Sequence, residues 1–321
     1  MVNFRGGTSL ALHQDVPAKP HGMVVTAVVL ASLAGVPPGL AQDAGRVRLV
    51  GEVKSHLLSP GDTLTALSAR LGLERRTLAA DNGLAATDVV VAGSTLQIDN
   101  RHIVPETMAA APIVVNIPQR MVFHRQGTAT GMPVAVGRPQ WATPTGSFTI
   151  VTREENPTWD VPRSILDEAR RRSRSHPARV PPGPANPLGA FWLGLSRAGI
   201  GLHGTNAPTS IYGFVSHGCI RLHPDDIGWL FSRVTIGDRV EVIYEPVLLA
   251  AVGPRVFLEV HSDPYRLAAP TLERVRDLAA ALGLTERVDW AAARRVTQLR
   301  HGVARDVTAP DSTPGEEGAL P

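Results

Sequence analysis

Cys219 is the single cysteine among the 321 residues of the chain, and it follows His203 by sixteen positions, within the segment Ser216-His217-Gly218-Cys219. One thiol has no partner for an internal disulfide bond, so it serves either as a buried apolar side chain or as a nucleophile with a histidine nearby in space. A free thiol, with a pKa of about 8.5, is mostly protonated at neutral pH, and a paired histidine can lower that pKa to give the thiolate that attacks a carbonyl. These residue types predict a thiol acyltransferase.

The residues around the thiol suit the same chemistry. His217 and Gly218 directly precede Cys219, and glycine lets backbone N–H groups face the oxyanion that develops during acyl transfer. Arg221 lies two residues after the thiol, on the same side of an extended chain, where its planar guanidinium could bind a substrate carboxylate. His217 has an equally strong alternative role, in which it only supports the turn through hydrogen bonds.

A zinc peptidase site is the competing enzymatic interpretation, with His203, His217, Cys219 and His223 as ligands. This spacing matches no familiar zinc motif, and a His-x-Cys pair would compete for one side of a short turn. The other histidines that we considered have no partner pattern, and we expect them at the surface: His124, His176 and His261.

Composition favours a β-rich protein with two or more domains. The chain is 43% apolar and contains 30 glycines and 27 prolines, which suits short strands joined by turns better than a helical bundle. The formal net charge is +3, and no basic stripe with interleaved aromatic residues is present, so we expect no nucleic-acid partner. Residues 170–174, which contain four arginines, are interpreted as a solvated helix face.

Residues 1–41 are predicted to be a secretory signal peptide. Their apolar run, residues 23–36, is shorter than the roughly 20 residues of a membrane span, and Gly39 and Ala41 suit cleavage before Gln42. We therefore expect export, with no stable membrane span after cleavage. An unpaired cysteine is a liability in an oxidising compartment unless it is used, which supports a functional thiol.

Residues 51–100 are predicted to form a small α+β module in the order strand, helix, helix, strand. The segment resembles a LysM domain through Pro60-Gly61-Asp62-Thr63-Leu64, through Asn82, and through the closing residues 93–98, Gly-Ser-Thr-Leu-Gln-Ile. The resemblance implies binding of glycan that contains N-acetylglucosamine.

From about residue 103 the pattern changes to apolar or alternating stretches of strand length, separated by turns rich in glycine and proline. These stretches cover residues 113–117, 121–124, 133–136, 147–151, 190–193 and 239–244. They predict a mainly β fold, either a sheet sandwich or a partly closed barrel. One helix is expected with Asp225 and Asp226 in its first turn, followed by apolar residues at helical spacing to Val234.

Residues 103–246 resemble the L,D-transpeptidase catalytic domain of the YkuD and ErfK type. The similarity runs through residues 142–150, 156–159, 180–184 and 186–189, then through His203-Gly204-Thr205-Asn206 and the segment 216–222, Ser-His-Gly-Cys-Ile-Arg-Leu.

The resemblance implies a role for each matched residue of the site. Cys219 is the nucleophile, His203 its general base, and the backbone carbonyl of Gly204 orients the imidazole. His217 and Gly218 belong to the oxyanion side. The implied substrate-binding residues are Arg221, Asn206 and Ser216.

The implied enzyme is periplasmic, acts on peptidoglycan stem peptides and glycan strands, and needs no cofactor or metal. Cys219 attacks the carbonyl at the L-centre of the third stem residue, D-alanine leaves, and an amine takes the acyl group from the thioester. That amine belongs to another stem peptide or to a wall-attached lipoprotein. Water as acceptor would make the enzyme an L,D-carboxypeptidase, and a non-catalytic LysM protein that only binds the wall is a further alternative.

Residues 247–305 are predicted to be a partly helical extension, with a strand at 256–260 and amphipathic helices at 271–282 and 288–299. Residues 306–321, rich in proline, glycine and acidic side chains, are predicted to be disordered.

Overall fold

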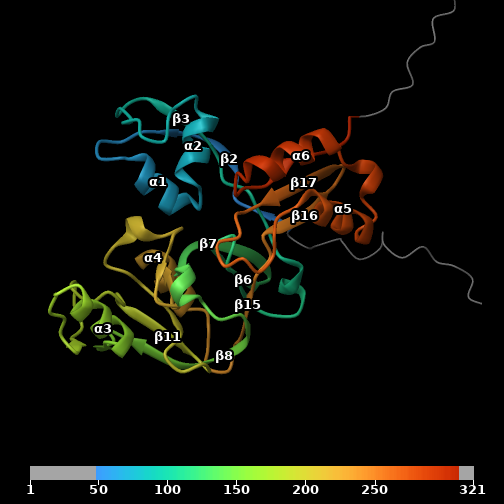
Figure 1. Ribbon diagram of the computed structural model, residues 1–321. Coiled ribbons are helices and arrows are strands. Elements are labelled where there is room, and N and C mark those ends of the chain that lie inside the picture. The colour runs from blue at the N-terminus through green and yellow to red at the C-terminus, as the bar shows by residue number, and fades with distance from the viewer. Residues whose placement is uncertain (1–47, 311–321) are drawn as a thin grey trace, which may run out of the picture. The chain divides into compact units, whose positions relative to one another are not determined.

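The computed structural model of the protein describes residues 48–310 (Figure 1). The predicted signal peptide and most of the predicted tail, residues 311–321, lie outside the described residues. Within residues 48–310, no helix combines the length and the apolar character that crossing a membrane requires.

The amino-terminal module, residues 51–100, has the predicted element order. It consists of β2 (Val53–Leu57), α1 (Leu64–Leu71), α2 (Arg75–Asp81) and β3 (Thr95–Asp99), with β2 and β3 antiparallel. The Thr63 side chain accepts a hydrogen bond from the Ala66 N–H at the start of α1, and Gly72 ends the helix with a φ of 71°, a backbone conformation that glycine adopts without strain. These two signals explain why the helix has the length that the sequence predicts.

The central part of the chain, residues 103–246, forms a closed β-barrel. Its strands follow the order β13-β7-β14-β12-β11-β8-β15-β5-β6, and β6 also pairs with β7, which closes the sheet on itself. The bounds are β5 (Ile113–Asn116), β6 (Met121–Gln126), β7 (Thr128–Gly137), β8 (Gly146–Glu155), β11 (Phe191–Leu195), β12 (Gly201–His203), β13 (Phe214–Ser216), β14 (Ile220–Leu222) and β15 (Arg239–Ile243). The mainly β prediction is confirmed, and of the two predicted forms the barrel is the one present.

Helix α4 (Pro224–Phe231) is the predicted helix of the barrel region. Asp225 and Asp226 lie in its first turn, where their charges interact favourably with the positive end of the helix dipole. Ile227 and Leu230 are buried in the same core as the inward side chains of the strands. The apolar face of α4 therefore covers part of the barrel, close to the end of β14.

An insertion between β8 and β11 contains β9 (Trp159–Asp160), α3 (Arg163–Arg171) and β10 (Arg179–Val180). No residue of α3 is fully buried, as expected for a solvated helix. Two further short strands, β1 (Leu49–Val50) and β4 (His102–Ile103), pair antiparallel where the chain leads into and out of the amino-terminal module.

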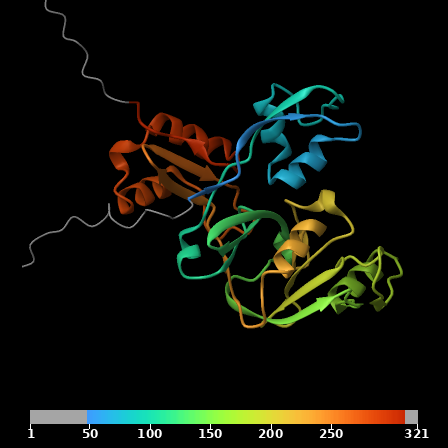
Figure 2. The ribbon, with the colours of Figure 1, turned by 180° about the vertical axis from the view of Figure 1, so that it is seen from behind.

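The carboxy-terminal module, residues 247–310, is a three-stranded sheet covered by two helices. Its elements are β16 (Val247–Val252), β17 (Arg255–Val260), α5 (Leu272–Ala281), α6 (Trp290–Leu299) and β18 (Arg305–Asp306). Both helices lie beside β16 and β17, as the two opposite views in Figures 1 and 2 show. The start of the predicted disordered tail was placed too early, because β18 includes Asp306 and Val307 is only 1% exposed.

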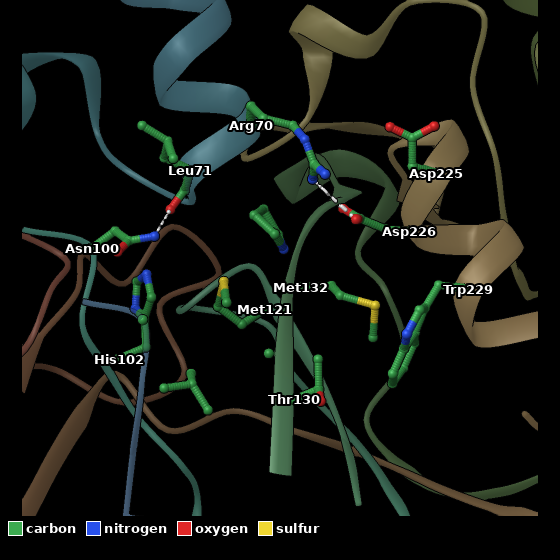
Figure 3. A pocket seen from close by; sticks show the side chains of 14 residues that line it. Arg70, Leu71, Asn100, His102, Met121, Thr130, Met132, Asp225, Asp226 and Trp229 are labelled. Atoms are coloured by element: carbon green, nitrogen blue, oxygen red, sulfur yellow. Dashed lines mark hydrogen bonds and ion pairs between the residues drawn. The ribbon is translucent and has the colours of Figure 1, made fainter. Parts of the chain in front are cut away.

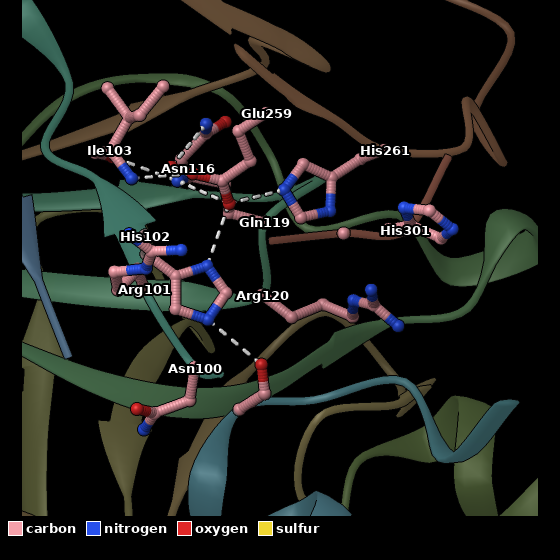
Figure 4. A network of polar contacts seen from close by, with 12 residues as sticks. Asn100, Arg101, His102, Ile103, Asn116, Gln119, Arg120, Glu259, His261 and His301 are labelled. Atoms are coloured by element: carbon pink, nitrogen blue, oxygen red, sulfur yellow. Dashed lines mark hydrogen bonds and ion pairs between the residues drawn. The ribbon is translucent and has the colours of Figure 1, made fainter. Parts of the chain in front are cut away.

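A polar network connects the three parts, and Figure 4 shows it from close by. Glu259 of β17 is fully buried and accepts hydrogen bonds from His102, Gln119, His261 and the Ile103 N–H. The expectation that His261 lies at the surface is therefore wrong, and His124, only 5% exposed, is buried as well. Contacts distant in sequence decide the burial of both imidazoles.

Candidate active site

Strand pairing places His203 beside the segment that follows the thiol. In β12, His203 lies opposite Trp192 of β11 and next to Arg221 of β14, the second pairing being parallel. Because β12 and β14 run in the same direction, the residues that lead into them meet at one edge of the barrel. Cys219 leads into β14, and its Sγ donates a hydrogen bond to the Gly199 carbonyl, 3.3 Å away, just before β12.

The imidazole of His203 is buried and held in one orientation. Its Nδ1 lies 2.6 Å from the Gly204 carbonyl oxygen, and because a carbonyl only accepts, Nδ1 carries the hydrogen and Nε2 has the free lone pair. Trp192 stacks on the ring, with 5.8 Å between the ring centroids. Burial, together with the nearby charge of Arg221, lowers the pKa of His203 to about 3, so the ring is neutral at physiological pH.

The thiol is also neutral in this arrangement. Burial raises the pKa of Cys219, against the opposing effects of a backbone hydrogen bond at Gly201 and the charge of Arg221. Among residues 48–310, no hydrogen bond joins Sγ to His203, since the sulfur donates to Gly199 instead. The expectation of a histidine-lowered thiol pKa is thus not met in the resting structure.

Ser216 shapes the turn that carries the thiol. Its hydroxyl donates to the Cys219 carbonyl at 2.5 Å and accepts from the Gly218 N–H at 3.1 Å, and the residue is only 1% exposed. These contacts support a role for Ser216 in shaping the turn, and substrate binding by Ser216 stays a prediction. The turn also requires glycine at 218, where φ is 110°.

The hydrogen bonds of Ser216 also bear on which backbone N–H groups could stabilise an oxyanion. The Gly218 N–H is bonded to Ser216 and is not available to substrate in this arrangement. Within residues 48–310, by contrast, the backbone N–H groups of His217 and Cys219 have no hydrogen-bond acceptor. The N–H of Cys219 is therefore the better candidate donor.

His217 belongs to a charged cluster that the sequence did not reveal. Its Nε2 lies 2.7 Å from Glu168 Oε2 and 2.6 Å from Arg138 Nη2, and its ring centroid lies 5.3 Å from that of Trp141. The hydrogen bond from Arg138, followed by that from His217, lowers the pKa of Glu168 to about 2. Glu168 is on α3 and Arg138 follows β7, so no local pattern around position 217 could have found them.

A cavity of about 400 Å³ lies against this cluster. It is lined by Arg138, Gln140, Trp141, Glu168, Arg171 and Arg172. Three guanidinium groups against one carboxylate make its lining cationic, which suits a ligand that carries carboxylates.

Two predicted substrate-binding residues remain accessible. Arg221 is partly exposed, it forms no ion pair with another described residue, and its buried Nε has no hydrogen-bond partner. Asn206 is exposed, and its amide donates to the Ala185 carbonyl at 3.2 Å, which leaves the side-chain oxygen open. Both can contact a ligand, and Arg221 offers an unpaired charge.

Two further cavities involve the amino-terminal module. One of about 140 Å³ is lined by residues 62–65, Arg75 and residues 86–90. The other, of about 400 Å³, lies between α1 and α4 (Figure 3). At this cavity, Nη1 of Arg70 donates to both carboxylate oxygens of Asp226, at 3.0 Å each. Neither cavity is lined by Cys219 or His203.

The zinc interpretation finds no support in the geometry. In the part of the chain that the structure describes, three or more possible ligand atoms converge only at His102, Glu259 and His261. That group contains none of the four side chains of the zinc hypothesis, and its members already hydrogen-bond to one another.

The chain is similar in sequence to known proteins over most of its length. The family model for the L,D-transpeptidase catalytic domain matches residues 111–242, and that for the LysM domain matches residues 57–99. A probable L,D-transpeptidase ErfK/SrfK of Salmonella typhimurium is 32% identical over 279 residues, covering 82% of this chain and 88% of the relative. The probable L,D-transpeptidase YcfS of Escherichia coli is 32% identical over 281 residues, covering 81% and 85%. The solved L,D-transpeptidase 3 of Mycobacterium tuberculosis is 20% identical, with a TM-score of 0.34 over 48% of this chain and 76% of that one.

Proposed function

Because the chain belongs to the L,D-transpeptidase family, we propose that it is an exported peptidoglycan L,D-transpeptidase that works through a thioester on Cys219. The observation that carries this proposal is the parallel pairing of β12 with β14. Its register pairs His203 with Arg221, so the thiol lies two residues before the strand partner of a neutral imidazole whose Nδ1 carries the hydrogen, which supports Nε2 as the proton acceptor.

The chemistry begins from the neutral pair. His203 Nε2 takes the thiol proton as Sγ attacks the carbonyl carbon at the L-centre of the third stem residue, and the Cys219 N–H stabilises the oxyanion. When the C–N bond breaks, the imidazolium gives its proton to the departing amine of D-alanine. In this mechanism the thiol gives up its hydrogen bond to the Gly199 carbonyl before its proton passes to His203.

The charges around the site indicate how the stem peptide is held. Arg221 is unpaired beside the thiol, and the cavity next to His217 carries three arginines. Stem peptides carry free carboxylates, which guanidinium groups bind in a planar, two-bond geometry. In the same proposal, the LysM domain binds the glycan strand and the protein works in the periplasm.

The acceptor that we propose is an amine, from a second stem peptide or from the lysine of a wall-attached lipoprotein. Attack by the amine nitrogen on the thioester carbon forms the new amide and returns the proton and the thiol to the enzyme. With water in place of the amine, the same thioester gives an L,D-carboxypeptidase product.

Intact-protein mass spectrometry after exposure to a carbapenem tests the acylation step. We expect a covalent adduct on the wild type and none on Cys219→Ala, with a much slower adduct on His203→Ala. His176→Ala is a matched control, because within residues 48–310 the polar and ring contacts of His176 are limited to the Pro177 carbonyl and the Trp159 ring.

Incubation with purified muropeptides then identifies the acceptor. A cross-linked product together with free D-alanine indicates transpeptidation, whereas a shortened stem alone indicates hydrolysis. Identical product profiles from the wild type and Cys219→Ala would instead show a protein that only binds the wall.

A further inference from the structure

We propose that Tyr265, in the carboxy-terminal module, is a positioning residue for the catalytic thiol. It holds residues 137–143, here called the 137–143 loop, which pack against the turn that carries Cys219. Tyr265 lies beyond residues 111–242, which match the catalytic-domain family, so the module outside that domain supplies part of the frame of the site. This inference rests on the proposed cysteine chemistry.

The phenol oxygen of Tyr265 joins the two ends of the loop. It donates to the Gly137 carbonyl at 2.5 Å and accepts from the Thr143 N–H at 3.1 Å. The buried side chain of Thr143 also joins the two ends, since its hydroxyl accepts from the Gly137 N–H at 2.8 Å. The loop ends approach so closely that a side chain on Gly137 would lie 2.2 Å from the Trp141 carbonyl.

The 137–143 loop in turn lies against the three residues before the thiol, Ser216, His217 and Gly218. The Arg138 N–H donates to the Ser216 carbonyl at 3.1 Å, and the Trp141 ring packs on the His217 imidazole. The carbonyls of Ala142 and Trp141 lie 3.6 and 3.8 Å from the position that a Cβ on Gly218 would occupy. A displacement of the loop therefore reaches the backbone on which Sγ and the proposed oxyanion donor depend.

Tyr265 is itself fixed from several sides. Its ring stacks on Tyr244 at 5.4 Å and meets Phe214 edge-on at 6.0 Å. Its N–H donates to the Tyr244 hydroxyl, which donates to Asp263 at 2.6 Å. The ring therefore holds the hydroxyl in place, and removing the oxygen alone should leave the packing intact.

The test compares two tyrosine-to-phenylalanine variants of the full chain. Tyr265→Phe keeps the ring and removes both loop bonds, while Tyr212→Phe removes a hydroxyl that donates to the Gly302 carbonyl and has no part in the loop. The measurement is the rate of carbapenem acylation at saturation and the concentration for half-saturation. We expect the saturating rate of Tyr265→Phe to fall about tenfold or more with a much smaller change in half-saturation, because small misplacements of reacting groups cost large rate factors.

Substitutions of Thr143, which also joins the two ends of the 137–143 loop, extend the test. Thr143→Val should slow acylation, Thr143→Ser should restore it, and the double variant with Tyr265→Phe should be less than additive, because both residues act on one loop. Urea unfolding of each protein separates these effects from lower stability. Equal rate losses in Tyr265→Phe and Tyr212→Phe, or no loss in either, would overturn the inference. A wild type that carbapenems do not acylate would instead overturn the proposed function.

Discussion

At the scale of single residues, the site holds its nucleophile and base as neutral groups. Burial raises the pKa of Cys219 and lowers that of His203 to about 3. The charge of Arg221 favours the thiolate but disfavours the protonated imidazole, so it assists loss of the proton from sulfur and opposes its acceptance by His203. The resting enzyme is thus protected from unwanted thiol chemistry, and we expect the thiolate to form mainly during attack on substrate.

This arrangement predicts an unusual pH dependence. His203 stays unprotonated as the pH falls from 7 to about 5, since its folded pKa is far below the ordinary value of about 6.5, so acylation should show no acidic limb in that range. Alkylation of the free enzyme by iodoacetamide should rise steadily from neutral pH to about pH 9, because the thiol pKa is raised. Pseudo-first-order rates across this range check both statements, with Cys219→Ala as the blank for labelling elsewhere. An alkylation plateau near neutral pH would show a preformed thiolate and contradict the prediction.

At the scale of elements, two short strands and one exposed helix make the site. β12 and β14 have three residues each, and their pairing decides which side chains meet. Helix α3 adds Glu168, which binds Arg138, His217 at 2.7 Å and Arg172 at 2.8 Å. The arginine-rich end of α3 was interpreted as a solvated face. The Glu168 carboxylate of this helix nevertheless connects it to His217, two residues before the thiol.

Glu168→Gln tests this role of α3. The amide keeps the size of the side chain and removes the charge that holds Arg138 and His217 together, so we expect acylation to slow several-fold while the unfolding midpoint changes little. Asp167→Asn is the matched control, because the Asp167 carboxylate is exposed and, among the described residues, pairs with Arg170 alone. The measurement compares the carbapenem acylation rates of Glu168→Gln and Asp167→Asn with that of the wild type. Equal rates in both would show that the Glu168 cluster has no influence on the thiol.

At the scale of the whole molecule, buried and surface charges connect the parts of residues 48–310. Arg70 pairs with Asp226, Arg120 with Glu74 at 2.7 Å, and Arg305 with Asp81 at 2.6 Å. At the centre, burial alone would raise the pKa of Glu259, but the charges and hydrogen bonds of His102 and His261 outweigh it and hold that pKa at about 2. His102 also bonds the Gly72 carbonyl at 2.9 Å, so one network reaches all three parts (Figure 4).

Glu259→Gln should therefore destabilise the fold strongly. An amide nitrogen would face donors that now approach a carboxylate, and breaking a buried ion pair typically costs about 3 to 5 kcal/mol. Urea unfolding at neutral pH measures the loss, with the exposed Glu273→Gln in α5 as control.

The same carboxylate predicts a pH effect on stability. The folded pKa of Glu259 is lower than the ordinary value of about 4.3, so its contribution is present above that pH and is lost as the pH falls toward 2. The stability of Glu259→Gln should change less over that interval than that of the wild type. Equal slopes for the two proteins would show that Glu259 is not ionised in the native state.

The sequence alone determined the local elements and the candidate chemistry. Helical spacing was enough to locate α1, α5 and α6, and apolar or alternating stretches located β5 to β8, although β7 and β8 extend several residues beyond the predicted stretches. A lone cysteine in a motif with His203 indicated a thiol acyltransferase. Such features depend on residues within one or two turns or one strand of each other.

Only the tertiary structure decided what those elements place together. The pairing of β15 with β5 in the barrel and the contacts of Glu168 and Tyr265 with the site join residues far apart along the chain. The burial of His261 likewise depends on packing between distant segments. Strand register and packing between distant segments set these contacts, and a side chain has the same local pattern whether such a partner is present or not.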